Sequence, residues 1–195
     1  MLFAWLTKPW WTVAIARSLV CENQVVPSDA VLIENFDPGY QLFEQARLLR
    51  EKGLASRVLV PVATEVDSPQ PQPVALATTE MVARLARLGA FEVVPIREVE
   101  PISLNAGIDV RRFLEREGLK SVLVVTPLFR SRRSALVYGA TLGPGVTVRC
   151  APTTEGTRSV TTWTRTWHGV QEVTEQWIKL QYYRLWVLPF FDDAR

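Results

Sequence analysis

The stretch Ser121–Val125 reads SVLVV, and it is the strongest indication of the fold class of this chain. Its last four residues are apolar and three of them are valines, which favours an extended strand. A strand that is apolar on both faces is typical of a parallel sheet that is covered on both sides. We therefore expect residues 121–125 to form an interior strand of a parallel sheet.

On both sides of this strand, short apolar runs alternate with segments of helical periodicity. The predicted strands are residues 30–33, 57–62, 91–96, 121–125 and 146–150. The predicted helices are residues 41–52, a segment that begins at Thr78 or Thr79 and ends at Gly89, and residues 107–117, 130–142 and 170–186. Alternation of strands and helices implies right-handed crossovers. The sequence thus predicts an α/β fold: an open, mostly parallel Rossmann-like sheet of about five strands with helices on both faces.

Two segments carry further structural expectations. We expect residues 63–77 to be a loop, because Pro69, Pro71 and Pro73 alternate with glutamine and resist both helix and sheet. The final helix places Trp177, Leu180 and Tyr183 on one side.

The composition indicates how many domains the chain forms and which classes of function it disfavours. A chain of 195 residues suits a single domain, which we place at residues 18–195 after a Trp-rich extension at 1–17. A net charge of +2 gives no reason to expect a nucleic acid partner. No apolar run reaches the roughly 18 residues of a membrane span. One histidine, His168, and two cysteines argue against a zinc site, and the pairing of Cys21 with Cys150 stays open.

Polar residues follow the ends of the predicted strands, where open α/β sheets bind their ligands. These strand ends are residues 34–37, 61–64, 98–105 and 126–130. The side chains that we expect to contact a ligand there are Glu34, Asn35, Asp37, Ser103, Asn105, Thr126, Arg130 and Arg133.

Each of these candidates also has a structural interpretation. Arg130, Arg132 and Arg133 open a helix, where they either hold a phosphate or carboxylate or form a solvated helix start. Glu34 and Asp37 either hold a cation or ligand hydroxyl groups or, for Asp37, form a turn. The remaining candidates, Ser103, Asn105 and Thr126, either bind a ligand or act as caps.

The two ends of the chain are rich in aromatic residues. Met1–Ala16 reads MLFAWLTKPWWTVAIA, and residues 186–191 read WVLPFF. These segments either extend the core or contact a membrane surface or a protein partner, because tryptophan prefers the boundary between water and lipid. The residues expected in such a contact are Trp5, Trp10, Trp11, Trp186, Phe190 and Phe191.

Three stretches carry a resemblance to a known family. The first is SDAVLIEN followed by FEQARLLREKGLASRVLV, the second is FLEREGLKSVLVVTPLFRSRRSALVYGATL with VTVRCAPT, and the third is TEQWIKLQYYRLW. Together they resemble the YdcF/SanA/ElyC family over about residues 18–186. This resemblance implies a Rossmann-like fold, and some members of the family act in bacterial envelope maintenance.

The resemblance also shows where this chain departs from the family. Glu34 and Asn35 replace a glycine-rich turn, Pro61-Val62-Ala63 replaces Ser-Gly-Gly, and Arg130 replaces a histidine. The resemblance therefore implies a catalytically degenerate domain that acts as a binding or structural protein, as an accessory subunit of a larger or membrane-associated assembly. No cofactor is predicted. The alternative is an enzyme or small-molecule binder for a nucleotide-like ligand such as S-adenosylmethionine.

Overall fold

A computed structural model of the chain describes residues 8–22, 25–36, 39–65, 68–153 and 159–191. Two of the predicted contact residues, Trp5 and Asp37, lie outside these ranges.

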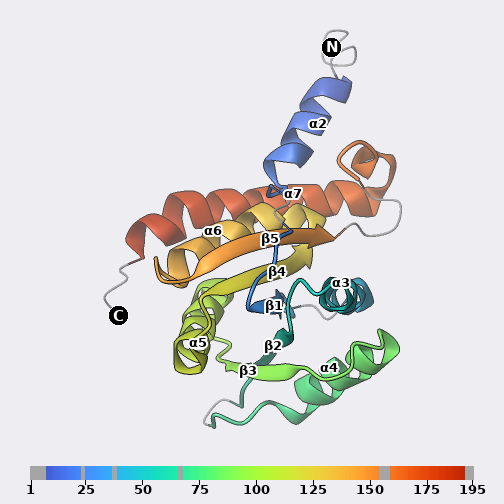
Figure 1. Cartoon of the computed structure of the whole chain (residues 1–195). Coiled ribbons are helices and arrows are strands. Elements are labelled where there is room, and N and C mark those ends of the chain that lie inside the picture. Colours follow the sequence, from blue (N-terminus) through green and yellow to red (C-terminus); the bar gives the residue numbers. More distant parts are fainter. Residues whose placement is uncertain (1–7, 23–24, 37–38, 66–67, 154–158, 192–195) are drawn as a thin grey trace.

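Five parallel strands form a single sheet in the order β3-β2-β1-β4-β5 (Figure 1). The strands are β1 (Ala30–Ile33), β2 (Arg57–Ala63), β3 (Glu92–Ile96), β4 (Ser121–Pro127) and β5 (Thr147–Thr153). Strand β1 is central, and Val31 is paired with Val58 of β2 and with Leu123 of β4. Strand β4 is paired on both sides, which confirms that SVLVV is an interior strand.

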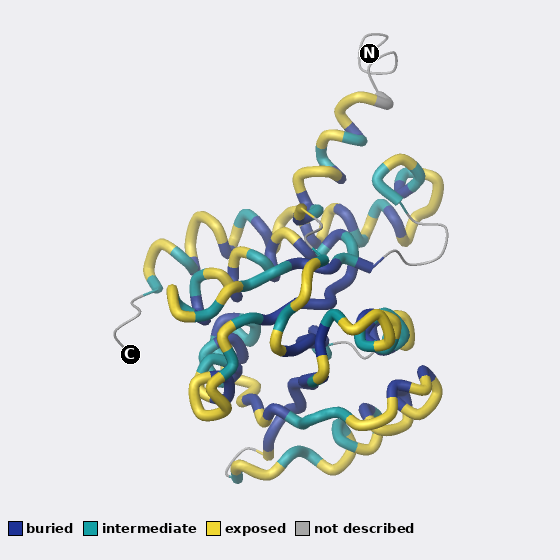
Figure 2. The backbone as a smooth tube through the Cα atoms, in the orientation of Figure 1, coloured by how far each residue is buried: buried dark blue, intermediate teal, exposed yellow. Residues whose placement is uncertain are grey.

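Helices cover both faces of this sheet, as the sequence predicts. They are α3 (Tyr40–Glu51), α4 (Pro73–Leu85), α5 (Ile102–Glu117) and α6 (Ser131–Thr141). Phe43 of α3 and Ala83 of α4 pack with Val31 on one face. Val110 of α5 and Tyr138 of α6 pack around Leu32 on the other face. The sheet interior is accordingly buried along its whole length (Figure 2).

Helices α4 and α5 begin about five residues before their predicted starts. Helix α4 begins at Pro73, so residues 73–77 are helical and Thr79 is a buried mid-helix residue rather than a cap. Proline suits the first helical position, because its missing N–H has no partner within the helix there. Helix α5 begins at Ile102, although the weak helix formers Ser103, Asn105 and Gly107 lie in its first turns.

The C-terminal helix α7 (Trp167–Tyr182) packs on α6 and continues as a π-helical turn over Tyr183–Val187 and a 3-10 turn over Leu188–Phe190. Leu180, Tyr183 and Val187 are buried, whereas Trp177 is exposed. The prediction for this side of the helix is therefore confirmed for Leu180 and Tyr183 and wrong for Trp177, because Gln176 is buried in its place.

Helix α2 (Lys8–Ser18) is part of a core at one end and exposed at the other, so each of the two interpretations of the N-terminal segment applies to one end of it. Ala16 and the following Leu19 are buried against Phe129 and Trp163, so the C-terminal end of the helix is part of a core. The other end projects from the body of the molecule (Figure 1), and Trp10 is 84% exposed. No helix of the described residues is both long and apolar enough to span a membrane.

A disulfide fixes the segment after α2 to the sheet. Cys21 is bonded to Cys150 of β5, and their Cα atoms are 6.5 Å apart. The backbone N–H of Cys21 also donates to Ser131 Oγ at 2.9 Å. The structure thus resolves the open pairing of the two cysteines.

Candidate functional site

Most of the predicted site residues lie at the carboxyl ends of the strands, in two separate groups. The first group lies between β1 and β4, where the strand order reverses and ligands of such sheets bind. The second group lies beside it, at the ends of β1, β2 and β3. We describe the two groups in turn.

Glu34 follows β1 and turns into the interior of the first group. It is only 1% exposed, and its Oε2 accepts hydrogen bonds from the hydroxyls of Thr126 and, at 2.7 Å, Ser134. The hydroxyls of Thr126 and Ser134 also lie 3.2 Å apart. We call Glu34, Thr126 and Ser134 the switch-point cluster. Its three side chains hydrogen-bond to one another and so join β1, β4 and α6.

Tyr138 lies one helical turn beyond Ser134, on the same side of α6. Burial raises the pKa of its phenol, and the nearby carboxylate of Glu34 raises it further. Its hydroxyl has no hydrogen-bond partner among the described residues. The phenol is thus held in its neutral form beside the switch-point cluster.

Arg133 links α6 to two other elements. One of its terminal nitrogens donates to Ser103 Oγ of α5 at 2.9 Å, and its guanidinium lies 5.3 Å from the ring centroid of Tyr183. The side chain is 7% exposed, and no described carboxylate lies within salt-bridge distance of it. Such a buried cation is stabilised here by a hydroxyl and an aromatic face.

The two arginines of this region also act on α7. Lys179 holds the pKa of the Glu175 carboxyl below its usual range, at a distance of 2.5 Å, and the charges of Arg130 and Arg133 lower it further. The Nε atoms of both arginines are buried and have no partner among the described groups. Positive charge is therefore concentrated between α6 and α7.

Asn35 belongs to the second group, which surrounds a cavity. Its Nδ2 donates to the carbonyl of Pro61 at 3.1 Å and to Thr79 Oγ1 at 3.0 Å. The cavity has a volume of about 280 Å³. Its lining includes Asn35, Phe36, Val62, Thr79, Ile96 and Glu98. We call it the Asn35 pocket.

Neither Ser103 nor Asn105 caps helix α5. The residue before the helix is Pro101, which makes no side-chain cap. Asn105 Nδ2 instead donates to the carbonyls of Val99 and Pro101, at 3.0 and 3.4 Å, so it fixes the loop before the helix. Thr126 likewise does not cap a helix, since its hydroxyl is bonded to Glu34. The capping interpretation of these three residues is wrong.

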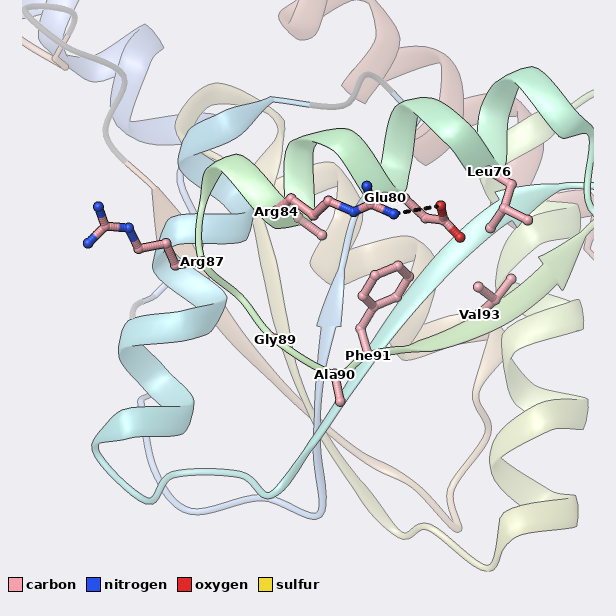
Figure 3. Close-up of a pocket in the computed structure, with 9 residues that line it drawn as sticks. Leu76, Glu80, Arg84, Arg87, Gly89, Ala90, Phe91 and Val93 are labelled. Atoms are coloured by element: carbon pink, nitrogen blue, oxygen red, sulfur yellow. Dashed lines mark ion pairs between the residues drawn. The ribbon is translucent and has the colours of Figure 1, made fainter.

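Two further grooves lie away from the strand ends. A groove of about 640 Å³ runs between α4 and the edge strand β3 (Figure 3), with Phe91 in its middle and the ion pair of Glu80 with Arg84, 3.7 Å long, beside it. Arg87 points away from this groove (Figure 3). The second groove, of about 490 Å³, lies between the loop before α5 and the end of the chain. Its lining includes Leu104, Tyr182, Trp186, Phe190 and Phe191.

Sequence reasoning missed Ser134, Thr79 and Glu98. Ser131, Ser134 and Tyr138 lie at positions i, i+3 and i+7, so polar groups fall on the buried side of a helix, and this spacing was a usable signal. No local pattern marks Thr79, and the sequence places Glu98 only within the strand end at residues 98–105. They meet Asn35 only because α4 and the loop after β3 lie beside the end of β1.

Comparison of this chain with protein-family models, with curated proteins and with solved structures finds no match in any of the three. The resemblance to the YdcF/SanA/ElyC family stays a prediction that rests on the three stretches quoted above. The structure therefore provides the evidence on which a function can be proposed.

Proposed function

We propose that this protein is a binding domain rather than an enzyme, and that it attaches to a membrane surface through the outer side of its C-terminal helix. One observation carries the proposal: large apolar side chains on that side are exposed. They are Trp177, Ile178, Tyr182, Leu185, Trp186 and Phe190. We call them the α7 aromatic face.

The spacing of these residues makes one continuous surface. Ile178, Tyr182 and Leu185 follow each other at one-turn intervals, and the rings of Trp186 and Phe190 lie 5.6 Å apart. Trp186 is 65% exposed and Phe190 is 76% exposed. The opposite side of the same segment is buried through Leu180, Tyr183 and Val187. A segment that is apolar on both sides favours a second covering surface.

The charge of this face favours a lipid surface as its cover. The ionisable side chains at residues 177–190, tyrosines aside, are Lys179, which is paired with Glu175, and Arg184. Basic residues beside tryptophan and tyrosine suit anionic headgroups and the boundary between water and lipid. Trp186 and Phe190 also line the groove next to Leu104, which offers space for part of an acyl chain.

Helix α2 carries a second group of exposed aromatic side chains. It rises from α7 on the side away from the sheet (Figure 1), and its far end carries Trp10 and Trp11, both exposed. Its near end shares a core cluster with Val173 and Leu180 of α7. Val173 and Leu180 lie on the buried side of α7, so Trp10 and Trp11 form a second exposed aromatic group, separate from the α7 aromatic face.

The switch-point cluster argues against catalysis by Glu34 at the strand ends. Catalytic carboxylates must reach a substrate, but Glu34 is buried and already bonded to Thr126 and Ser134. This arrangement joins three elements of the fold and contributes to its stability.

Vesicle sedimentation tests the membrane proposal. The probe is a vesicle of phosphatidylcholine with about one quarter phosphatidylglycerol. A variant with Leu185, Trp186 and Phe190 changed to serine should lose at least about tenfold in partitioning, because each buried large apolar side chain contributes on the order of 2 kcal/mol. Pure phosphatidylcholine should bind the parent protein more weakly.

Helix α4 provides a matched control. Val74, Met81 and Leu85 are also exposed and apolar, but they lie on the far side of the sheet. Their change to serine should leave partitioning unaltered. Equal loss in both triple variants, or no binding of the parent protein to either vesicle, would contradict a membrane surface and leave a protein partner as the cover.

A further inference from the structure

The groove between helix α5 and the end of the chain has a floor that belongs to the core. Leu104 of α5 and Val187 of the π-helical turn are 8% and 7% exposed, and they pack in one cluster with Tyr183. Ile108 follows Leu104 one helical turn along α5 and also lines the groove. Because its floor is made by two elements that pack on each other, the groove is formed before any ligand binds.

One wall of this groove is shared with the α7 aromatic face. Tyr182, Trp186 and Phe190 belong to both, and the rings of Trp186 and Phe190 lie 5.6 Å apart. All three side chains are exposed. The groove therefore lies directly beside the surface that we propose to be covered by lipid.

The polar side chains of the lining are engaged by the backbone around them. Asn105 Nδ2 donates to the carbonyls of Val99 and Pro101, at 3.0 and 3.4 Å. The Glu100 carboxylate accepts the backbone N–H of Ile102 at 3.3 Å. No lysine or arginine is among the described residues that line the groove. This lining favours an uncharged apolar body, and a charged headgroup would stay outside it.

The volume of the groove is sufficient for most of one acyl chain. It measures about 490 Å³. At about 30 Å³ for a group of the size of a water molecule, this is space for roughly 16 such groups. One chain of ordinary length fills this space, and a second chain finds none.

We propose that the groove takes up the acyl chain of one lipid molecule from the membrane to which the α7 aromatic face attaches. This inference rests on the proposed function, because that membrane is the source of the lipid. It adds a site of limited length to an attachment that otherwise depends only on an exposed surface. Affinity for a single-chain lipid should therefore increase with the length of the chain.

A titration followed by NMR tests the groove, with hexyl-, octyl- and decylphosphocholine as soluble probes, each kept below the concentration at which it forms micelles. The methyl signals of Leu104, Ile108 and Val187 should shift in a saturable way. Affinity should increase at least about fivefold from octyl to decyl, because each buried methylene contributes up to about fourfold. Phosphocholine, which has no chain, should not shift these signals.

Two tryptophan variants separate filling of the groove from general effects on the fold. Ile108→Trp places a larger side chain in the groove and should weaken decylphosphocholine binding at least about fivefold. Leu48→Trp is the matched control, because Leu48 is partly exposed on α3, which packs on the opposite face of the sheet from α5. It should leave binding within about twofold. Thermal unfolding checks that both variants are folded.

Two results with these probes would each overturn the groove alone, in a protein that still sediments with vesicles. The first is the absence of saturable shifts with decylphosphocholine, and the second is unchanged affinity in a folded Ile108→Trp protein. A parent protein that binds decylphosphocholine but sediments with neither vesicle would contradict the membrane, both as the cover of the α7 aromatic face and as the source of the chain.

Discussion

Two carboxylates flank the central strand β1, and each connects it to β4, but they do so in opposite surroundings. Asp29 lies before the strand and is exposed, and its Oδ2 accepts the backbone N–H groups of Lys120 and Ser121, each at 2.8 Å. Glu34 lies after the strand and is buried, and it accepts the hydroxyls of Thr126 and Ser134. The same chemical group therefore joins the same two strands at both ends of the sheet.

Asp29 and Glu34 differ in what can hydrogen-bond to them once a protein donor is removed. At the exposed end, water can hydrogen-bond to Asp29 if a protein donor is removed. At the buried end, no water reaches Glu34, so a lost hydroxyl leaves a carboxylate without its partner. We therefore expect equivalent deletions to destabilise the fold more at Glu34 than at Asp29.

The largest effect is expected for Thr126→Val. This variant keeps the shape of the side chain but removes a donor to a buried carboxylate, and it should lower the free energy of unfolding by about 3 kcal/mol. Ser121→Ala is the comparable change at the exposed end, because the Ser121 side chain hydrogen-bonds to the Asp29 carboxyl group and also accepts the backbone N–H of Asp29 at 2.9 Å. It should lower stability by about 1 kcal/mol or less. Urea unfolding at neutral pH measures both.

A double variant tests whether the loss of stability in Thr126→Val comes from the Glu34 carboxylate. If the loss in Thr126→Val comes from Glu34, adding Glu34→Gln should restore part of it, because a neutral amide is less costly to bury than a charged group. Simple additivity of the two substitutions would contradict a direct coupling.

Gly107→Ala tests whether the buried end depends on the position of α6. A Cβ atom at Gly107 would lie 2.3 Å from Oγ1 and 2.9 Å from Cβ of Thr141, a residue of α6 that is fully buried. Overpacking of this kind should lower stability by about 2 kcal/mol and displace α6, which carries Ser134.

Gly139, on the exposed side of α6, is the control for this substitution. It has nothing within 4 Å of a new Cβ atom, so Gly139→Ala should stabilise the protein by about 0.5 to 1 kcal/mol. Thermal unfolding measures the pair. Similar Tm shifts for both variants would rule out close packing at Gly107 as the cause.

A small effect that depends on pH is expected for Asp29→Asn. The backbone N–H of Lys120 and the contacts with Ser121 hold the pKa of Asp29 below its ordinary value of 3.8. Because the folded pKa is the lower one, the stabilisation is complete at neutral pH and is lost as the pH falls below 3.8 toward the folded pKa. Solvent screens this exposed group, so we expect a difference of about 1 kcal/mol at pH 7.

Unfolding curves between pH 7 and pH 2 test this dependence. The stabilities of the parent protein and Asp29→Asn should converge at the acid end. A constant difference over the whole range would show that the charge of Asp29 is not its cause.

The sequence predicts the sheet well because its signals are local. SVLVV and the short run at residues 30–33 are apolar on both faces, and that pattern requires a covered parallel sheet. The start of α4 was mispredicted because Pro73 was taken as a helix breaker, although proline fits the first helical turn. Trp177 is predicted on the inner side because tryptophan is apolar and glutamine is polar, yet Gln176 is buried and Trp177 is exposed.

The candidate site was only partly predictable, because its contacts join distant residues. The position of Glu34 after a strand was readable, but its inward orientation depends on Ser134, 100 residues away. The Asn35 pocket requires α4, whose Thr79 is 44 residues from Asn35. Such pairs follow from the packing of whole elements rather than from the neighbours of each residue.

The disulfide between Cys21 and Cys150 determines how the molecule carries mechanical load. The two residues are 129 positions apart, so the covalent ring that they close contains all of β1 to β4. A force that pulls on α2 passes through this bond into β5, an edge strand of the sheet. The pull is therefore borne by a covalent link between the two ends of the ring, and the strands inside it are not peeled away one after another.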